Sequence, residues 1–439
     1  MRGFMGYNMC SQQALITSMT RTTNFVVKTY QFPGQHIREY AGATRSGKDD
    51  TLYLEAKQYI PRNNPEPEAG DVTVLALQAI GFPKELYEPL FDHLLESSAQ
   101  HGWRIRSIWI ADASVQGASG LLNEHTQGDE PSSFDCARDM LHMINVFREH
   151  FVQPIVAIGH SMGATTLIQL STMHPRLLAN LVLFDPIIGF AGPEFSGMFY
   201  HNSIRDDVWS SHEAAEDHFR KAWRKWDPQV VDLWMKYGLR DTPTAMHPKP
   251  NKVTLTTSKA QEGWLYSRPA FGLDLEGNAT IATGSSLQRA KYPDMNDTIS
   301  TMHPFYRPED GPVWANLVYV RPSVLYVFPS KGPGSRVTQE KVERTGSGIG
   351  GSGGVRAGRV AQETVDGVGH HLLFEKPQKC ATIASSWIGR DLEKWSECRR
   401  HAQEHADDKS VNKLALSEVW KRRAREVYLR SKAGRQAKL

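Results

Sequence analysis

The sequence has few of the residues that build disulfide frameworks or metal sites. Its 439 residues include only four cysteines, and no two of them lie close together along the chain: Cys10, Cys136, Cys380 and Cys398. Zinc sites and disulfide-rich domains place cysteines in closely spaced sets. We therefore expect no metal site and no disulfide framework, and the thiols suit a reducing or neutral compartment.

An excess of charge of one sign and a long apolar run are also missing. The chain has 51 Lys and Arg residues against 48 Asp and Glu residues, a net charge of +3. A polyelectrolyte partner requires a strongly basic or acidic balance, so no nucleic acid partner is expected. No run approaches the roughly 18 apolar residues of a membrane-spanning helix, so no transmembrane segment is expected.

The first 22 residues lack the features of a targeting peptide. They are polar and rich in Met, without the apolar core of a secretory signal or the arginine bias of a transit peptide. They also show no clear periodicity. We predict that residues 1–22 form a disordered extension.

What the chain does contain is an alternation of apolar runs with helical segments. Residues 24–30 and 52–60 alternate apolar with polar side chains, as the strands of a hairpin do. Further apolar runs then alternate with helical patterns, including a long amphipathic one at 134–151. Because this alternation is typical of a mostly parallel sheet flanked by helices, we predict an α/β fold. The predicted strands are 72–77, 105–111, 154–158, 181–184, 324–328 and 359–365.

One long segment interrupts the alternation. Residues 187–320 contain six tryptophans among helical patches and prolines, and long insertions in compact domains are usually functional. We predict a helical cap over the catalytic face, in which most of these tryptophans have a packing role. The expected domains are thus a core at 23–186 and 321–400, a cap at 187–320, and a charged helical tail at 401–439.

A glycine-rich stretch at 346–354 matches the dinucleotide-binding pattern through Gly346, Gly348 and Gly351. That pattern requires a strand before it and a helix after it. Here charged residues precede it and a strand follows, so we predict a surface loop and no dinucleotide site. Arg356 and Arg359, just beyond, are candidates for contacts with substrate phosphates.

The segment at 159–163, Gly-His-Ser-Met-Gly, carries the predicted chemistry. It is a G-x-S-x-G motif between an apolar run and a helix-compatible run at 164–172. In this context the motif is a nucleophile elbow, in which small residues permit a sharp turn and the serine sits on strained backbone. The alternative is a glycine-rich loop with an incidental serine. The strand-turn-helix context favours Ser161 as a catalytic nucleophile.

A serine nucleophile needs a base and an acid that orients the base. In this fold the histidine follows the last strand, where His370 and His371 both lie. We prefer His370 because it follows Gly369; His371 is expected to pack or to face solvent.

The acid is harder to place, because its usual position after the strand at 324–328 offers no carboxylate at 329–335. Asp185 ends the strand that follows the elbow helix, and carboxyl ends of strands are where sites assemble in open α/β sheets. We predict Asp185 as the acid; the alternative is that it caps the turn at Pro186.

The oxyanion of an acyl-transfer intermediate requires two backbone N–H donors. One comes from the residue after the nucleophile, Met162, and the other from the loop after the strand at 72–77. That loop reads Gln78-Ala79-Ile80-Gly81. Ile80 is the preferred donor, with Ala79 and Gly81 as alternatives.

The chain ends in Ala437-Lys438-Leu439, a variant of the S-K-L peroxisomal address, after a polar stretch at 430–435 that would keep it accessible. We expect recognition by the peroxisomal import receptor and a location in the peroxisome matrix. A chance ending on a basic tail is the alternative.

Together with the elbow, three segments give the chain a resemblance to a known family: Gln-His-Ile-Arg-Glu-Tyr at 35–40, Pro-Lys-Glu-Leu-Tyr-Glu-Pro-Leu at 83–90 and Ala-Arg-Asp-Met-Leu at 137–141. Residues 24–375 resemble fungal peroxisomal α/β-hydrolases, the family of the acyl-CoA hydrolase of mycophenolic acid biosynthesis and the hydrolases of AK-toxin-type clusters. The resemblance matches Ser161, Asp185 and His370 to the family's triad. The family's phenylalanine after the nucleophile is Met162 here, and its His-Gly is Gln78-Ala79.

The resemblance implies a serine hydrolase that cleaves an acyl-CoA thioester or a related ester, an intermediate of fungal toxin or natural-product biosynthesis. It also implies a homodimer and no cofactor. Two other readings stay open: a carboxylesterase or lipase acting on a polyketide or lipid ester, and a non-catalytic α/β-hydrolase scaffold that acts by binding.

Overall fold

A computed structural model describes residues 14–47, 50–189, 196–269, 271–273, 279–281, 305–332, 336–406 and 414–436. The chain divides into two compact units, Met1–Asp391 and Leu392–Leu439, which are described separately.

The first unit is built on a nine-stranded sheet with the order β1-β2-β3-β5-β4-β6-β7-β15-β16. Strands β1, β2, β3 and β5 pair antiparallel, and all pairs from β5 to β16 are parallel. The predicted α/β-hydrolase architecture is confirmed. The strands are β1 Leu15–Arg21, β2 Phe25–Pro33, β3 Tyr53–Pro61, β4 Val72–Leu77, β5 Ile105–Ala111, β6 Ile155–His160, β7 Asn180–Phe184, β15 Ser323–Pro329 and β16 Val360–Val365.

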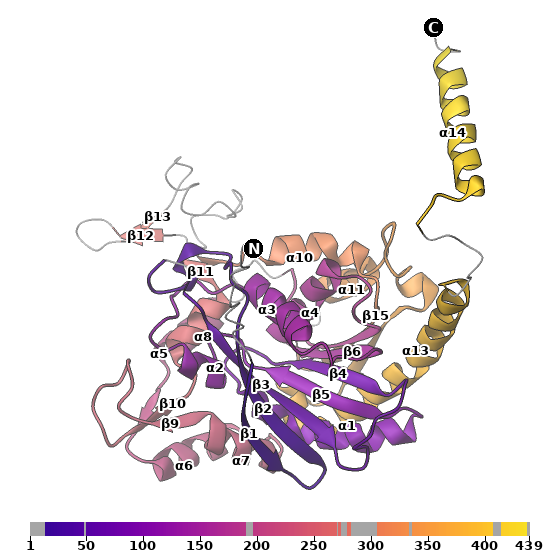
Figure 1. Cartoon of the computed structure of the whole chain (residues 1–439). Coiled ribbons are helices and arrows are strands. Elements are labelled where there is room, and N and C mark those ends of the chain that lie inside the picture. Colours follow the sequence, from indigo (N-terminus) through magenta and orange to yellow (C-terminus); the bar gives the residue numbers. More distant parts are fainter. Residues whose placement is uncertain are drawn as a thin grey trace, which may run out of the picture. The chain divides into compact units, whose positions relative to one another are not determined.

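The central strands are buried along their whole length. Every residue of β4, β6, β7 and β15 is buried, as is typical of parallel strands covered on both faces. Figure 1 shows α3 and α4 on one face of the sheet and α1 on the other. The helices of the core are α1 Glu88–Gln100, α2 Gly117–Leu122, α3 Ser133–Val146, α4 Met162–Met173, α11 Arg336–Arg344, α12 Leu372–Glu375 and the start of α13 Pro377–Ala406.

Helix α3 is shorter than its sequence pattern. It begins after Ser132, whose side chain accepts a hydrogen bond from the Phe134 N–H, and it ends at Val146 instead of residue 151. The pattern extends further because Phe147 and Phe151, beyond the helix end, are also buried in the core.

The extension predicted to be disordered is partly ordered. Residues 1–13 lie outside the described part of the chain, but β1 pairs antiparallel with β2 through six register positions, starting at Leu15↔Gln31. The side chains of Leu15, Ile16 and Met19 are more than half exposed. The strand is therefore held by backbone pairing, and side-chain periodicity could not reveal it.

The predicted cap contains helices and also a small sheet. Strands β8 Val208–Trp209, β10 Val253–Leu255 and β9 Leu239–Asp241 form a three-stranded sheet. The helices are α5 Ser196–Ile204, α6 His212–Ala222, α7 Pro228–Tyr237, α8 Lys259–Tyr266 and α10 Asp310–Asn316; two short ladders pair β11 Arg268–Pro269 with β14 Phe305–Tyr306 and β12 Phe271–Leu273 with β13 Ala279–Ile281.

The end of the predicted cap belongs to the core. Val313 of α10, together with Leu317 and Val320 just after it, lies in the main hydrophobic cluster beside the strands. Earlier in the insertion, Leu265 of α8 packs with Ile80, Val115 and Met162 in a second buried cluster.

The second unit contains the end of α13 and helix α14 Glu418–Gln436, whose described side chains are mostly exposed and charged. No helix of the described chain is long and apolar enough to cross a bilayer. Ala437-Lys438-Leu439 lies outside the described residues.

Candidate active site

Ser161 stands at a sharp turn between β6 and α4. Its φ of 56° and ψ of −118° lie in a region that non-glycine residues rarely adopt, at a cost of about 1–3 kcal/mol. A Cβ on Gly159 would lie 2.5 Å from the Ala164 Cα, and one on Gly163 would lie 2.5 Å from the Leu77 carbonyl oxygen. Both glycines are needed for α4 to pack so closely on the strands.

Three of the predicted side chains lie in line. The Ser161 Oγ is 2.9 Å from Nε2 of His370, and Nδ1 of His370 is 2.6 Å from Oδ2 of Asp185. Because an ionised carboxylate only accepts hydrogen bonds, Nδ1 donates to Asp185, and Nε2 is left to accept from the serine hydroxyl. This is the arrangement in which an oriented imidazole acts as a base for a hydroxyl.

The carboxylate of Asp185 is thus directed to the imidazole rather than to the turn at Pro186. The loop after β15, where the acid was first sought, instead supports the histidine loop. The Ser330 Oγ accepts a hydrogen bond from the Gly367 N–H at 2.8 Å, and the Lys331 N–H donates to the Val368 carbonyl at 3.1 Å.

His371 packs against aromatic side chains, which is one of the two roles expected for it. Its ring lies 5.2 Å from that of Trp226 and 5.3 Å from that of Phe82, measured between centroids. Burial, with a smaller effect of His370, lowers the pKa of His371 from 6.5 to about 3. The imidazole is therefore neutral across the working range of most enzymes.

Two of the candidate oxyanion donors already donate hydrogen bonds to other groups. The Ala79 N–H donates to the Tyr87 hydroxyl at 2.9 Å, and the Gly81 N–H donates to Gln116 Oε1 at 3.1 Å. Among the described residues, no acceptor meets the N–H of Ile80 or that of Met162. Of the donors considered, these two are left available for an incoming oxyanion.

Sequence reasoning missed a hydrogen-bonded chain behind the triad. Nε2 of the fully buried His160 lies 2.8 Å from the His370 carbonyl, which can only accept, so Nε2 carries a proton. Nδ1 of His160 must then accept from the Tyr87 hydroxyl at 2.9 Å, and that hydroxyl accepts from Ala79. Burial, followed by the charge of His370, lowers the pKa of His160 well below 6.5, so the ring stays neutral. The oxyanion loop and the histidine loop are therefore linked through the elbow.

A buried ion cluster anchors the oxyanion loop from the other side. Lys84 Nζ lies 2.7 Å from Asp112, 3.0 Å from Glu55 and 3.1 Å from Glu85. Burial alone would lower the pKa of Lys84, but the three carboxylates raise it well above 10.5. Asp112 also accepts from the Gln78 side chain at 3.2 Å, so Gln78 points into this cluster.

Apolar side chains close the site above the serine. Ile80, Val115, Met162 and Leu265 of α8 form one buried cluster, with Tyr266 packed against it. Met162 is only 2% exposed. The side chain of Met162, the residue after Ser161, is thus part of an apolar wall.

The chain was compared with known families and proteins. A family model described as the alpha/beta hydrolase family matches residues 72–383. The type I acyl-CoA thioesterase mpaH' of Penicillium brevicompactum is 35% identical over 422 residues, which cover 91% of this chain and 95% of that protein. The mpaH enzyme of Penicillium roqueforti is 34% identical over 94% of this chain and 99% of its own length.

More distant relatives share the architecture. The abhydrolase domain-containing protein AKT2 of Alternaria alternata is 27% identical over 64% of this chain and 99% of that protein. Among solved structures, the peroxisomal alpha-beta-hydrolase Lpx1 of Saccharomyces cerevisiae superposes with a TM-score of 0.63 at 13% identity, over 95% of this chain and 99% of Lpx1. The elbow, the strand order and these whole-length matches lead to one conclusion: the chain belongs to the alpha/beta hydrolase family, in the branch that includes the fungal mpaH proteins.

Proposed function

We propose that this protein is a serine hydrolase that cleaves an acyl-CoA thioester, an intermediate of fungal secondary metabolism. The observation that carries the proposal is the Ser161–His370–Asp185 hydrogen-bonded chain, in a sequence similar over almost its full length to type I acyl-CoA thioesterases. In the same proposal Ser161, His370 and Asp185 are the nucleophile, base and acid.

The reaction follows from the geometry. The Ser161 Oγ attacks the thioester carbonyl while Nε2 of His370, at 2.9 Å, takes its proton. The oxyanion accepts hydrogen bonds from the N–H groups of Met162 and Ile80. Collapse expels the CoA thiolate, which takes the proton from His370. Water, deprotonated by the same imidazole, then attacks the acyl-enzyme and releases the free acid.

The experiment that tests the proposal compares the purified protein with Ser161→Ala on a panel of acyl-CoAs. Release of free thiol should require Ser161, with a loss of kcat of about 10⁴-fold or more. Ser347→Ala is the control, because this exposed serine lies before β16 and donates its hydroxyl to the Arg344 carbonyl. Equal thiol release by the wild type and Ser161→Ala would contradict the mechanism.

The same Ser161 also fits a carboxylesterase or lipase that acts on a polyketide or lipid ester. Oxygen esters of the same acyl groups, assayed beside the thioesters, distinguish the two reactions. A binding scaffold without catalysis is the remaining alternative, and it predicts that a fluorophosphonate probe fails to label Ser161.

The proposed location is the peroxisome matrix, reached through recognition of Ala437-Lys438-Leu439 by the import receptor. A fluorescent protein fused at the N-terminus should be punctate, and deletion of Leu439 should make it diffuse. We also propose a homodimer, which sedimentation of the purified protein tests: a mass near 49.3 kDa would contradict it.

A further inference from the structure

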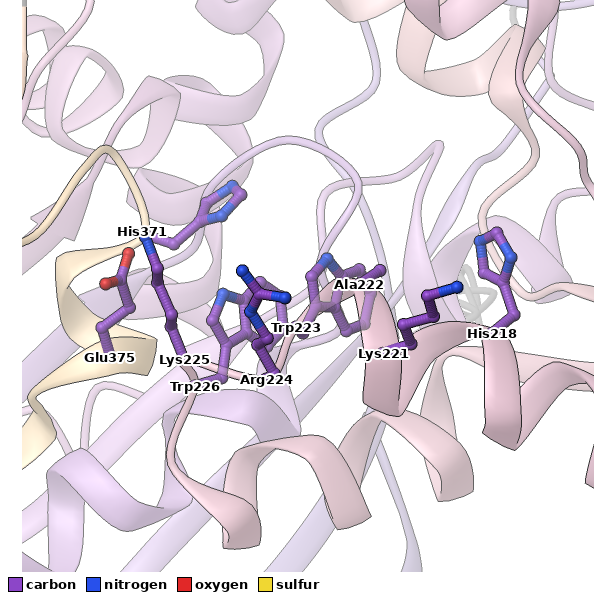
Figure 2. A pocket seen from close by; sticks show the side chains of 9 residues that line it. All are labelled: His218, Lys221, Ala222, Trp223, Arg224, Lys225, Trp226, His371 and Glu375. Atoms are coloured by element: carbon purple, nitrogen blue, oxygen red, sulfur yellow. The ribbon is translucent and has the colours of Figure 1, made fainter.

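A depression of about 770 Å³ opens beside the triad and is not used by the mechanism above. It is lined by the end of α6, the turn that follows it, and the chain just after His370. Figure 2 shows Lys225, Arg224 and Lys221 in a row, with His371 near one end and His218 at the other. The volume is in the range of small-molecule sites.

The depression has an excess of positive charge. Lys221, Arg224 and Lys225 are exposed, and among the described residues no carboxylate forms an ion pair with any of them. Neighbouring Arg220, by contrast, is paired with both Glu216 and Asp232. Glu375 is the one carboxylate of the lining, so three cations face one anion. Clustered cations without partners favour binding of a multiply charged anion.

The floor of the depression is aromatic and rigid. The rings of Trp223 and Trp226 stack at 4.0 Å with an interplanar angle of 9°, and Trp226 is only 6% exposed. Trp234 meets Trp223 edge-on at 4.5 Å, and Phe374 packs on Trp226 at 4.8 Å. Indole surfaces held in this way are suited to contact with a flat base.

One layer of side chains separates the depression from the catalytic groups. His371, in its lining, directly follows His370, and the two rings are 5.9 Å apart. Phe82, which follows Gly81 of the oxyanion loop, lies 5.7 Å from Trp226 and 5.3 Å from His371. A ligand here would therefore be next to the triad without touching Ser161.

We propose that the depression binds the 3′-phosphorylated ADP end of CoA, with the phosphates on Lys221, Arg224 and Lys225 and the adenine against the Trp223–Trp226 pair. This inference rests on the proposed thioesterase function. The pantetheine arm would then pass over the Phe82–His371 layer and bring the thioester to Ser161. The acyl chain would lie on the opposite side, against the Met162–Leu265 wall.

The other cations considered for the phosphates are badly placed. Arg359 lies at the N-terminal end of β16, whereas His370 follows its C-terminal end, and Arg359 is already paired with Asp391 at 2.5 Å. Arg356 lies in the same turn region before β16. Parallel strands put these residues at the edge of the sheet away from Ser161.

The kinetic test uses the triple variant Lys221→Ala, Arg224→Ala, Lys225→Ala on two substrates with one acyl group, the CoA thioester and the N-acetylcysteamine thioester. The second lacks the nucleotide. For acyl-CoA we expect KM to rise about 10-fold or more, since charge-assisted hydrogen bonds are lost, with kcat within about twofold. Both parameters should be unchanged for the short thioester.

The matched control is Arg176→Ala, Lys249→Ala, Lys252→Ala, which removes three exposed cations elsewhere and should leave both substrates unaffected. If the wild type hydrolyses both thioesters and its KM values equal those of the Lys221, Arg224, Lys225 variant, the inference is overturned. The thioesterase function would then remain intact. A wild type that hydrolyses neither would contradict the thioesterase function.

A binding measurement tests the depression without turnover. Calorimetry with adenosine 3′,5′-bisphosphate should detect binding to the wild type and to Ser161→Ala, weakened about 10-fold or more in the Lys221, Arg224, Lys225 variant. Binding should also weaken as the salt concentration rises. No binding to the wild type, or equal binding to the variant, would overturn the assignment.

Discussion

The Asp185 carboxylate reaches across a neighbouring strand to orient His370. Asp185 follows β7 and His370 follows β16, with β15 between these two strands, yet Oδ2 and Nδ1 are 2.6 Å apart. The φ of 42° at Asp185, a second strained position beside that of Ser161, turns the chain sharply at the strand end. Ser161 and Asp185 therefore follow the adjacent strands β6 and β7. His370 follows β16, the last strand of the sheet order.

From this relationship we expect Asp185→Asn to lower kcat by about 10³- to 10⁴-fold with little change in KM, because the amide no longer fixes the imidazole tautomer. Steady-state kinetics on the preferred acyl-CoA check this. The control is Asp366→Asn, an exposed residue of the histidine loop, which should retain full activity. More than a tenth of wild-type kcat in Asp185→Asn would show that another group orients His370.

The strained backbone of Ser161 predicts a gain in stability when the side chain is removed. Ser161→Gly should raise the free energy of unfolding by about 1–2 kcal/mol, because glycine adopts a φ of 56° without strain. Ser161→Ala keeps a Cβ and serves as the matched control, with a change near zero. Urea unfolding of the three proteins measures this. Equal stability of the two variants would mean that the turn is not strained.

The Tyr87–His160 link predicts a positioning effect. Tyr87→Phe leaves the Ala79 N–H and His160 Nδ1 without partners, so stability should fall by about 1–3 kcal/mol and kcat by about 10-fold at unchanged KM. Tyr326→Phe is the control. The buried Tyr326 hydroxyl lies 2.7 Å from the Thr345 hydroxyl, and neither group contacts the triad. It should lose similar stability and keep kcat. If kcat falls in both variants in proportion to their loss of stability, Tyr87 has a structural role only.

The low pKa of His371 predicts a dependence of stability on pH. In the unfolded chain this imidazole takes up a proton near pH 6.5, whereas in the folded protein it does so only near 3. Between these values the unfolded state binds more protons, so the free energy of unfolding falls as the pH falls, by up to about 1.4 kcal/mol per pH unit. Urea unfolding at pH 7.5 and 5.5 measures the slope.

His371→Gln should flatten this slope, although part of it will remain because the pKa of buried His160 is lowered as well. His174→Gln, at an exposed position, should leave the slope as it is in the wild type. If His371→Gln also leaves the slope unchanged, the His371 imidazole takes up its proton in the same pH range in the folded protein as in the unfolded chain.

The sequence was sufficient where local pattern and burial agree. Runs such as 72–77 and 105–111 became strands with the same bounds, because strands covered on both faces are mostly apolar. Ser161 was selected by its G-x-S-x-G motif and His370 by its place after the last strand. Asp185 was selected because sites assemble at the carboxyl ends of strands in open α/β sheets. By contrast, β1 depends on backbone pairing that leaves no side-chain pattern.

Contacts between distant segments were not predictable from one sequence. Tyr87 and His160 are 73 positions apart, and no local rule joins them. The basic depression did leave a signal, since residues 221–226 read Lys-Ala-Trp-Arg-Lys-Trp, but the tryptophans there were interpreted as packing alone. That interpretation is incomplete for both Trp223 and Trp226, which pack on each other and also line the depression.

The loop after β15 supports the histidine loop and does not supply a triad acid. Within its described residues, the Ser330 Oγ and the Lys331 N–H contact the histidine loop, and both contacts are to main-chain atoms. Any residue except proline can supply a backbone N–H donor, and serine or threonine can supply a hydroxyl. A substitution that changes the charge of this loop but keeps its backbone path would therefore leave the support of the histidine loop in place.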